Sequence, residues 1–228
     1  MACVLTREQI RRVDQLAMER YGIIGLVLME NAGRNASEII RDTYGDPGQA
    51  AIICGPGNNG GDGCVIARHL HNAEWSVRLM ITGEASQMTE DTRANFGIIE
   101  AMGLELCIAT DRVAQLRFVR SIREDEVVID GLLGTGFRGD VREPTAELIS
   151  VINTINKRAT VALDVPSGLD CDSGRPSNAT IQADLTVTFA AKKTGLVATS
   201  AAPYVGRLEV ADIGTPRELI DDVACGRA

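Results

Sequence analysis

Short apolar runs alternate with longer amphipathic segments over most of the chain. The apolar runs predict buried strands at 51–54, 75–81, 105–109, 126–129, 160–163, 185–189 and 208–210. Apolar residues at helical spacing predict helices at about 64–72 and at 90–102, 112–122 and 144–155. Strands separated by helices of this length are typical of βαβ units, so the pattern predicts an α/β fold with a mostly parallel sheet.

Two further helices are predicted before the first strand. Thr6 is a candidate N-cap, and Gln9 three residues later completes the spacing of a capping box. The first helix then carries an apolar stripe at Ile10, Val13, Leu16 and Ala17. The second helix is expected at about 24–41. Its segment 30–33, Glu-Asn-Ala-Gly, fits either a close helix contact or a contribution to a substrate site, and we expect the close contact.

Length and composition fit one α/β domain spanning residues 1–228. The chain is 45% hydrophobic and 24% charged, which supplies enough apolar material for a sizeable core. A formal net charge of −8 argues against a nucleic-acid or anionic-membrane surface, and no run approaches the roughly 18 apolar residues of a membrane span. The start of the chain shows no basic region followed by an apolar run, and Glu8 and Asp14 come too early for a typical transit peptide, so we expect no targeting segment. These features predict a cytoplasmic protein.

The cysteines and histidines form no disulfide or zinc pattern. The six cysteines lie far apart without a C-x-x-C pair, so we expect reduced thiols that fill apolar space. His69 and His71 are the only histidines, and both are expected on the surface of one helix, which argues against a zinc site.

The most informative stretch is the turn Gly55–Gly63, which follows the first predicted strand. Three of its glycines fit the G-x-G-x-x-G spacing, in which small residues let the backbone approach a phosphate at a helix N-terminus. A plain dinucleotide fingerprint does not need the polar side chains of Asn58, Asn59 and Asp62 in the same turn. The turn therefore predicts phosphate binding, with an unusual polar set beside it.

Polar side chains also follow two other predicted strands. Asp130 comes after the strand at 126–129, and Asp164 with Ser167 comes after the strand at 160–163. Each of these residues alone is explained by ordinary turn chemistry. Because ligands bind outside the carboxyl ends of the strands in an open α/β sheet, we expect the three polar loops to converge on one crevice.

The residue types suggest a chemistry for this crevice. Asn59, Asp130 and Ser167 offer amide, carboxylate and hydroxyl oxygens, which suit an alkali or alkaline-earth cation rather than zinc. Arg138 is a candidate partner for a phosphate, with a solvated loop arginine as the equally favoured alternative. Asp164 remains as a carboxylate near the substrate and is a candidate acid or base.

Taken together, the motifs resemble the YjeF N-terminal domain family, the NAD(P)HX epimerases. In chain order the matching stretches are LTREQIRRVDQLAMERYGI near the start, LMENAG at 28–33, GPGNNGGDG at 55–63, DGLLGTGFRGDVREP at 130–144, ALDVPSGLDCDSG at 162–174, TFAAKKTGL at 188–196 and VADIGTP at 210–216. GPGNNGGDG and DVPSGLD together are highly specific, and the resemblance covers almost the whole chain.

The resemblance implies an α/β fold of three αβα layers, Rossmann-like, with a mostly parallel sheet behind the two N-terminal helices. It also implies a homodimer and a bound potassium ion (K+), for which Asn59, Asp130 and Ser167 would be the ligands. Substrate contacts would come from two loops and one carboxylate: Asn58, Asn59, Gly60, Gly61, Asp62, Gly134, Thr135, Gly136, Phe137, Arg138, Gly139, Asp140 and Asp164.

The reaction implied by the resemblance interconverts the R and S forms of hydrated NADH and NADPH (NADHX and NADPHX), which carry a hydroxyl at C6 of the nicotinamide ring. A dehydratase that uses ATP or ADP accepts only the S form. We expect this partner as a separate chain, because the present chain ends soon after the epimerase pattern.

The implied chemistry needs an acid/base and no redox cofactor. Protonation of the C6 hydroxyl lets it leave as water, the ring nitrogen forms an iminium, and water returning to the other face inverts the centre. Asp164 is the candidate acid/base, and Lys193 would assist it. The family commonly has proline where this chain has Lys192 and Thr194, so the sequence leaves open which lysine faces the site; alignment favours Lys193. The potassium ion would be structural or would orient the substrate.

Two other functions stay open at this stage. The same domain occurs in an mRNA-decapping scaffold protein as a non-catalytic dimerisation and RNA-association module. The net negative charge of the chain and the presence of Asp130 and Asp164 argue against that function here. An ordinary NAD(P)-dependent oxidoreductase is the second alternative, but the strand at 75–81 offers only Glu84 for a ribose, and no Tyr/Lys pair or catalytic histidine is evident.

Overall fold

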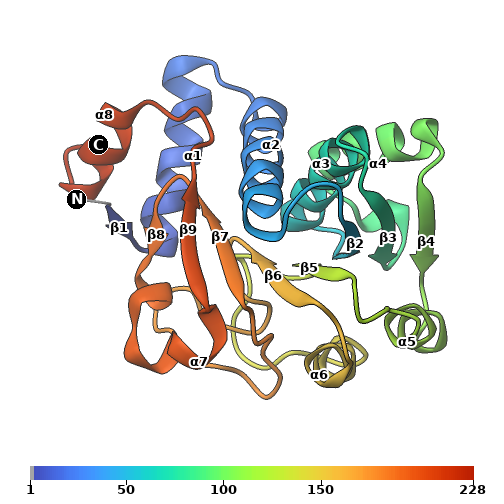
Figure 1. Ribbon diagram of the computed structural model, residues 1–228. Helices are drawn as coiled ribbons and strands as arrows, with labels where there is room; N and C mark the ends of the chain where they lie inside the picture. The colour runs from blue at the N-terminus through green and yellow to red at the C-terminus, as the bar shows by residue number, and fades with distance from the viewer. Residues whose placement is uncertain (1–2) are drawn as a thin grey trace.

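In the computed structural model, which describes residues 3–228, seven strands form one sheet with every neighbouring pair parallel (Figure 1). Met1 and Ala2, the first residues of the N-terminus assessed above for targeting signals, lie outside the described residues. In sheet order the strands are β4 (Glu105–Ala109), β3 (Ser76–Thr82), β2 (Gln49–Cys54), β5 (Val127–Gly131), β6 (Ala159–Leu163), β7 (Leu185–Phe189) and β9 (Arg207–Ala211).

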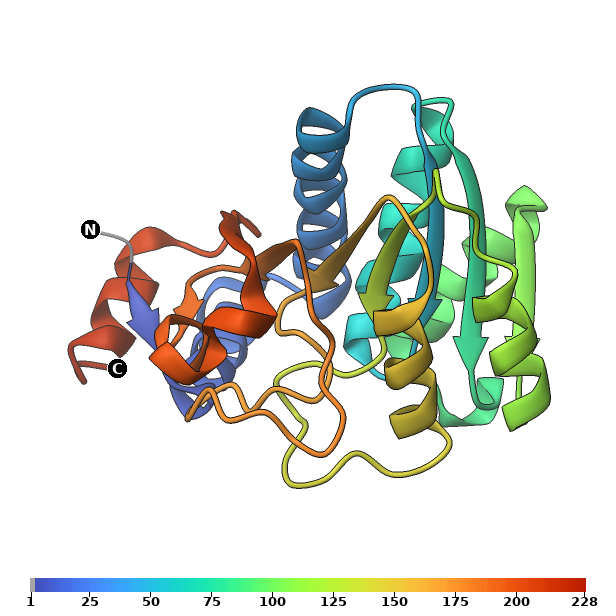
Figure 2. The ribbon, with the colours of Figure 1, turned by 60° about the horizontal axis from the view of Figure 1, so that its bottom comes forward.

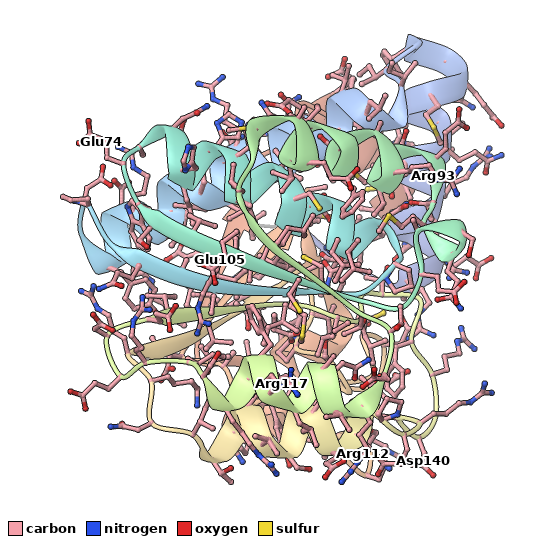
Figure 3. All side chains as sticks on the ribbon, turned by 90° about the vertical axis from the view of Figure 1, so that its right-hand side faces the viewer. Glu74, Arg93, Glu105, Arg112, Arg117 and Asp140 are labelled. Atoms are coloured by element: carbon pink, nitrogen blue, oxygen red, sulfur yellow. The ribbon has the colours of Figure 1, made fainter. Side chains whose placement is uncertain are left out.

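Helices cover both faces of this sheet and produce three layers. One face carries α2 (Gly25–Tyr44), α3 (Asn58–Asn72) and α4 (Glu90–Met102), and the other carries α5 (Arg112–Arg120) and α6 (Thr145–Thr154). Figure 3, viewed from the β4 edge, shows the sheet between these two groups. The three-layer α/β fold that we expected is confirmed, and the sheet is parallel throughout. No helix within residues 3–228 has the length and apolar character needed to cross a membrane.

The central strand β2 shows why both faces must be covered. Successive side chains of a strand point to opposite faces. Ile52 and Cys54 therefore belong to the core beneath α2 and α3, whereas Ala51 and Ile53 belong to the core beneath α5 and α6. All four side chains are fully buried, as expected for a strand with a continuous apolar run in a parallel sheet.

The strand order reverses direction between β2 and β5. From β2 the chain adds β3 and β4 on one side, and then returns to add β5, β6, β7 and β9 on the other. Adjacent loops that leave the sheet in opposite directions open a crevice at such a switch point. Here the crevice lies between the glycine turn after β2 and the loop after β5.

The N-terminal segment is anchored across the same end of the sheet. Strand β1 (Val4–Leu5) pairs in parallel with β8 (Lys192–Lys193), and Leu5 is the direct partner of Lys193. Helix α1 (Arg7–Tyr21) starts immediately afterwards with the predicted capping box between Thr6 and Gln9. Helix α8 (Arg217–Ala224) packs against α1, and Figures 1 and 2 show β1 beside α8 at this side of the molecule. The short helix α7 (Ala202–Val205) precedes β9.

Most predicted elements match their observed bounds to within three residues. Helix α3 is the main correction, because it begins at Asn58 rather than near residue 64. The two-residue strands β1 and β8 and the helices α7 and α8 were not predicted. All six cysteines are free thiols as expected, but Cys225 is exposed instead of filling apolar space. His71 is exposed as predicted, whereas His69 is half-buried and hydrogen-bonds Glu30.

The expected close helix contact at Gly33 is confirmed. A Cβ at this position would lie 2.5 Å from the Cβ of Val65 on α3, closer than two carbon atoms can approach. Glu30 does not reach toward the cavity described below; it pairs with Arg68 and His69 of α3. The segment 30–33 therefore fastens α2 to α3.

We predict that Gly33→Ala lowers the free energy of unfolding by about 1–3 kcal/mol, because the added methyl overpacks the α2–α3 contact. Gly97→Ala on α4 is the matched control. Nothing lies within 4 Å of a Cβ at Gly97, so alanine should stabilise this exposed helix position by up to about 1 kcal/mol. Urea unfolding of the two variants measures both effects. Equal changes for the two variants would contradict the contact at Gly33.

Candidate active site

A cavity of about 750 Å³ opens at the carboxyl ends of the strands, beside the switch point. The three polar loops predicted to converge do so here. Asn58, Asn59 and Asp62 line the cavity from the turn after β2, the segment 132–137 lines it from the loop after β5, and Asp164 lines it after β6. Helix α1 closes the cavity with Ile10, Arg11, Asp14 and Met18. This volume is typical of a small-molecule site.

Close backbone packing explains the glycines of the turn after β2. A Cβ on Gly60 would lie 1.8 Å from the carbonyl oxygen of Gly55, and a Cβ on Gly55 would lie 2.1 Å from that of Leu132. Only glycine fits at these two positions. Because α3 begins at Asn58, Asn59 and Asp62 lie in its first turns, where no side chain caps the helix. The N-terminus of α3 is thus free to receive an anion, as the sequence predicted.

Hydrogen bonds through the Leu133 carbonyl link Asn59, Asp130 and Ser167 at the carboxyl ends of the strands. Asp130 is fully buried, and its Oδ2 accepts a hydrogen bond from the Ser167 backbone N–H at 2.8 Å. Its Oδ1 accepts from the Ser167 hydroxyl at 2.6 Å. Asn59 Nδ2 donates to the Leu133 carbonyl at 2.9 Å, while Asn59 Oδ1 is buried without a hydrogen-bond partner in the described chain. Burial raises the pKa of Asp130 to about 6, partly offset by the Ser167 hydrogen bonds.

Ser167 links the Asp130 carboxylate to the Leu133 carbonyl that Asn59 also contacts, and Asn59 Oδ1 is the orphaned oxygen of this network. A hard cation would stabilise a buried oxygen that lacks a partner. Asn59, Asp130 and Ser167 therefore offer oxygens of the type that K+ takes, and the ion itself stays a prediction.

A buried ion pair joins the ends of β6 and β7. Lys193 is 1% exposed, and its ammonium donates to Asp164 Oδ1 at 2.5 Å, to the Thr188 hydroxyl at 2.9 Å and to the Phe189 carbonyl at 2.8 Å. All three ammonium protons are used. Lys192, by contrast, makes no such contact, so Lys193 is the lysine that faces the site.

The two oxygens of Asp164 differ in their surroundings. Oδ1 accepts hydrogen bonds from Lys193, Thr188 and the Phe189 backbone N–H. Oδ2 has no partner within residues 3–228, and Asp164 lines the cavity with its side chain 14% exposed. One oxygen is therefore anchored and the other is available to a bound ligand.

The backbone that carries Asp164 is strained. Asp164 has φ = 64°, and a hydrogen bond from Val165 N to Leu163 O closes a three-residue turn around it. Ala190, after the neighbouring strand β7, has φ = 62° and the equivalent bond from Ala191 N to Phe189 O. Turns of this hand are rare for residues with a side chain, and such strain tends to occur at functional sites. Both turns line the cavity.

Two further carboxyls of the cavity wall carry raised pKa values. Burial is the main cause of a pKa for Asp62 well above its ordinary value, and the charges of Asp164 and Asp14 add to it. Burial also raises the pKa of Asp14 to about 6, with a contribution from Asp164 that Lys193 opposes. Neither carboxyl has a hydrogen-bond partner in the described part of the chain. Titratable groups perturbed in this way and clustered in a cleft are typical of active sites.

Asp14 was not among the residues predicted for the site. A signal was present in the sequence, because Asp14 lies four residues after Ile10 and three before Ala17, within the apolar stripe of α1. A carboxylate on a buried helix face requires an explanation.

The loop after β5 contributes less to the cavity than expected. Gly134, Thr135, Gly136 and Phe137 line it, whereas Arg138, Gly139 and Asp140 are exposed and do not. Figure 3 shows Asp140 on the outer surface below the sheet, at the end where Arg112 of α5 lies. The basic side chain that lines the cavity near this loop is Arg11 of α1, which has no ion-pair or hydrogen-bond partner among residues 3–228.

Arg7 holds this loop in place. Its guanidinium is 2% exposed and donates to the Phe137 carbonyl and to Asp170, both at 3.0 Å, and to Cys171 Sγ at 3.2 Å. The start of α1, the loop after β5 and the loop after β6 are therefore joined by one buried side chain.

Comparison with known proteins agrees with this architecture. Residues 25–195 match the family described as YjeF-related protein N-terminus. The chain belongs to this family. Its sequence resemblance to the family is thereby confirmed. It also shares its fold with the crystal structure of the yeast protein ynu0, with a TM-score of 0.76 over 96% of this chain and 93% of that one, at 22% identity.

Curated relatives in this family extend over nearly the whole chain. An NAD(P)H-hydrate epimerase of Rhodopirellula baltica is 38% identical over 95% of this chain and 86% of its own length. The protein of the same name from Pirellula staleyi is 36% identical over 96% of both. A bifunctional NAD(P)H-hydrate repair enzyme Nnr from Moorella thermoacetica is 40% identical, but the match spans only 41% of that longer protein.

Proposed function

We propose that this family member is an NAD(P)H-hydrate epimerase, an isomerase that interconverts the R and S forms of NADHX and NADPHX. The observation that carries the proposal is the cavity wall itself. It combines an anchored carboxylate, a buried lysine and two unpaired carboxyls of raised pKa at the switch point of the sheet. Full-length relatives with the same name support this assignment over a non-catalytic module or an oxidoreductase.

The site residues divide into three tasks. Asp164 Oδ2 exchanges a proton at the C6 hydroxyl, and Lys193 fixes the carboxylate through Oδ1. The N-terminus of α3, with Asn58 to Asp62, and the backbone of Gly134–Phe137 receive the dinucleotide. Asp62 contacts the substrate from the cavity wall, and burial, which raises its pKa, favours a neutral carboxyl that can donate a hydrogen bond.

Asn59, Asp130 and Ser167 would hold K+, supported by the orphaned Asn59 oxygen and the buried Asp130 carboxylate. When bound, the ion would supply electrostatic compensation for Asp130 and a fixed position for the loops that carry these ligands. A monovalent ion is a weak Lewis acid, so this role is structural or orienting.

The wider context of the activity is also part of the proposal. Repair of both epimers requires an S-specific dehydratase, which we propose as a separate chain. The fused relatives named as bifunctional repair enzymes support this pairing of activities. We propose a homodimer, supported by exposed apolar side chains around the junction of α1 and α2: Met18, Tyr21, Ile24, Leu26 and Val27. The cytoplasmic location stays a prediction.

The primary test is a coupled assay on mixed R and S NADHX. With an S-specific dehydratase present, addition of this protein should convert the R half quickly, and Asp164→Asn should lower kcat about 10²- to 10⁴-fold. Asp42→Asn, an exposed carboxylate on α2, removes the same charge outside the cavity and should act like the wild type. If the wild-type protein does not accelerate recovery of the R form, the proposed function is wrong.

K+ binding is testable without any activity measurement. Thermal unfolding in K+ is compared with unfolding in tetramethylammonium at equal ionic strength. K+ at about 100 times its Kd should stabilise the fold by about 2.7 kcal/mol. Asn59→Ala should abolish this difference, whereas Asn58→Ala should retain it, because Asn58 contacts Thr89 rather than the ion ligands. A stabilisation by K+ that survives in Asn59→Ala would remove Asn59 from the ligand set.

The substrate phosphates should depend on Arg11 more than on Arg138. Arg11 lines the cavity without a partner, and Arg138 does not line it. Arg11→Gln should raise the KM for NADHX about 5- to 10-fold by loss of one charge-assisted contact. Arg138→Gln should change KM by less than about 2-fold, since an exposed charge outside the cavity contributes little. The reverse order of effects would restore Arg138 as the phosphate contact.

A further inference from the structure

We propose that Asp14 is a second proton-exchanging residue of the epimerase site, acting on the face of the nicotinamide ring opposite to Asp164. This inference rests on the proposed function. Asp14 belongs to α1, which lies outside the residues 25–195 that match the family. In this proposal Asp14 contacts the substrate directly and does not act through another side chain.

The placement of Asp14 carries the inference. Asp14 lines the cavity from α1, whereas Asp164 and Lys193 line it from the ends of the strands. Helix α1 is held at its start by the pairing of Leu5 with Lys193 and by the capping box. In the proposed complex the nicotinamide ring lies between the helix and the strand ends, with one face toward Asp14 and the other toward Asp164.

The carboxyl of Asp14 is also kept unpaired, which structural carboxylates in this protein are not. Asp170 accepts hydrogen bonds from Arg7 and Ser173, and Glu126 binds the guanidinium of Arg78. Within residues 3–228, by contrast, Asp14 has neither a hydrogen bond nor an ion pair. A mostly buried carboxyl without a partner destabilises the fold, so its presence in the cavity wall is best explained by a ligand.

Inversion at C6 requires proton exchange on both faces of the ring. For one epimer, protonated Asp14 gives its proton to the hydroxyl, the C–O electron pair leaves with the oxygen as water, and the ring nitrogen lone pair forms the C=N bond. Water then adds to C6 from the Asp164 face, its electron pair forming the new C–O bond, and Asp164 Oδ2 takes the released proton. The other epimer reacts with these roles exchanged, and solvent resets the two carboxyls between turnovers.

Burial is the main cause of the raised pKa of Asp14; the charge of Asp164 after β6 adds to it and that of Lys193 on β8 opposes it. The other charged groups of the cavity wall are Arg11 on α1, Asp62 on α3 and Asp91 on α4. The resulting pKa of about 6 is near neutral pH, where a carboxyl can both give and accept a proton. The pKa of Asp62 is also raised, by burial first and then by the charges of Asp164 and Asp14.

The test compares wild type, Asp14→Asn and Asp164→Asn, with Glu8→Gln as the matched control. Glu8 is an exposed carboxylate on the same helix and does not line the cavity. Epimerisation is followed by the coupled assay, and oxygen exchange is followed by loss of ¹⁸O from labelled NADHX. Asp14→Asn should lower kcat about 10²-fold or more with KM changed less than about 3-fold. Glu8→Gln should be unchanged.

Two readouts separate a catalytic role from a structural one. The wild-type kcat should change with pH around pH 6, and this change should be absent in Asp14→Asn. In addition, Asp14→Asn should still exchange ¹⁸O on the Asp164 face with retention, so that oxygen exchange becomes faster than epimerisation. Parallel loss of exchange and epimerisation, or a change of kcat around pH 6 that survives in Asp14→Asn but vanishes in Asp62→Asn, would overturn the proposal.

Stability measurements show whether the variant folds. Asp14 has a folded pKa raised above its unfolded value, so the native state binds more protons and ionisation destabilises it as pH rises through about 6. Asp14→Asn should therefore raise the unfolding midpoint at pH 7.5 and leave it nearly unchanged at pH 4. A fully active Asp14→Asn would refute the role of Asp14 alone, whereas inactivity of the wild type would refute the proposed function.

Discussion

The buried ammonium of Lys193 is the interaction on which the site depends. Four carboxyls line one cavity, and only one of the two basic side chains in its wall is buried. Lys193 uses its three protons on Asp164, Thr188 and the Phe189 carbonyl, so it offsets the acidic charge and fixes the strand ends together. Removal of one partner of a buried ion pair typically costs 3–5 kcal/mol, because the other charge remains without compensation. The same residue pairs with Leu5 and so determines where α1 begins.

The protein keeps several unfavourable features within this small region. Asp62, Asp14 and Asp130 are carboxyls whose burial raises their pKa values, and Asp164 and Ala190 have left-handed backbone conformations. Each feature destabilises the folded state, and none is needed to close the hydrophobic core. The central strands, by contrast, follow ordinary rules, with apolar side chains buried on both faces. Such local exceptions are expected where function, rather than folding, selects the residue.

The sheet could be predicted from the sequence because apolar runs and helical spacing are local signals, and the converging strand ends follow from parallel topology. Other features depend on tertiary contacts. The start of α3 was missed because Asn-Asn-Gly-Gly-Asp-Gly disfavours a helix, and packing against Gly55 and Leu132 overrides that preference. Strands β1 and β8 are too short to give a pattern. Arg138 and Asp140 belong to a motif that matches the family, and they were therefore expected in the site. The loop instead turns away from the cavity after Phe137, whose carbonyl accepts a hydrogen bond from Arg7.

The anchoring of α1 also explains how a helix outside the sheet can supply precise site residues. Its fixed points are the pairing of Leu5 with Lys193, the cap at Thr6 and the Arg7 contacts, and all lie at its start. Arg11 and Asp14 follow within about two turns of these contacts, so their backbone positions are fixed relative to the strand ends. At the strand ends, the hydrogen bonds of Ser167 to Asp130 and of Asn59 to the Leu133 carbonyl give the cavity a comparable fixed point, so both walls of the cavity are held by buried contacts.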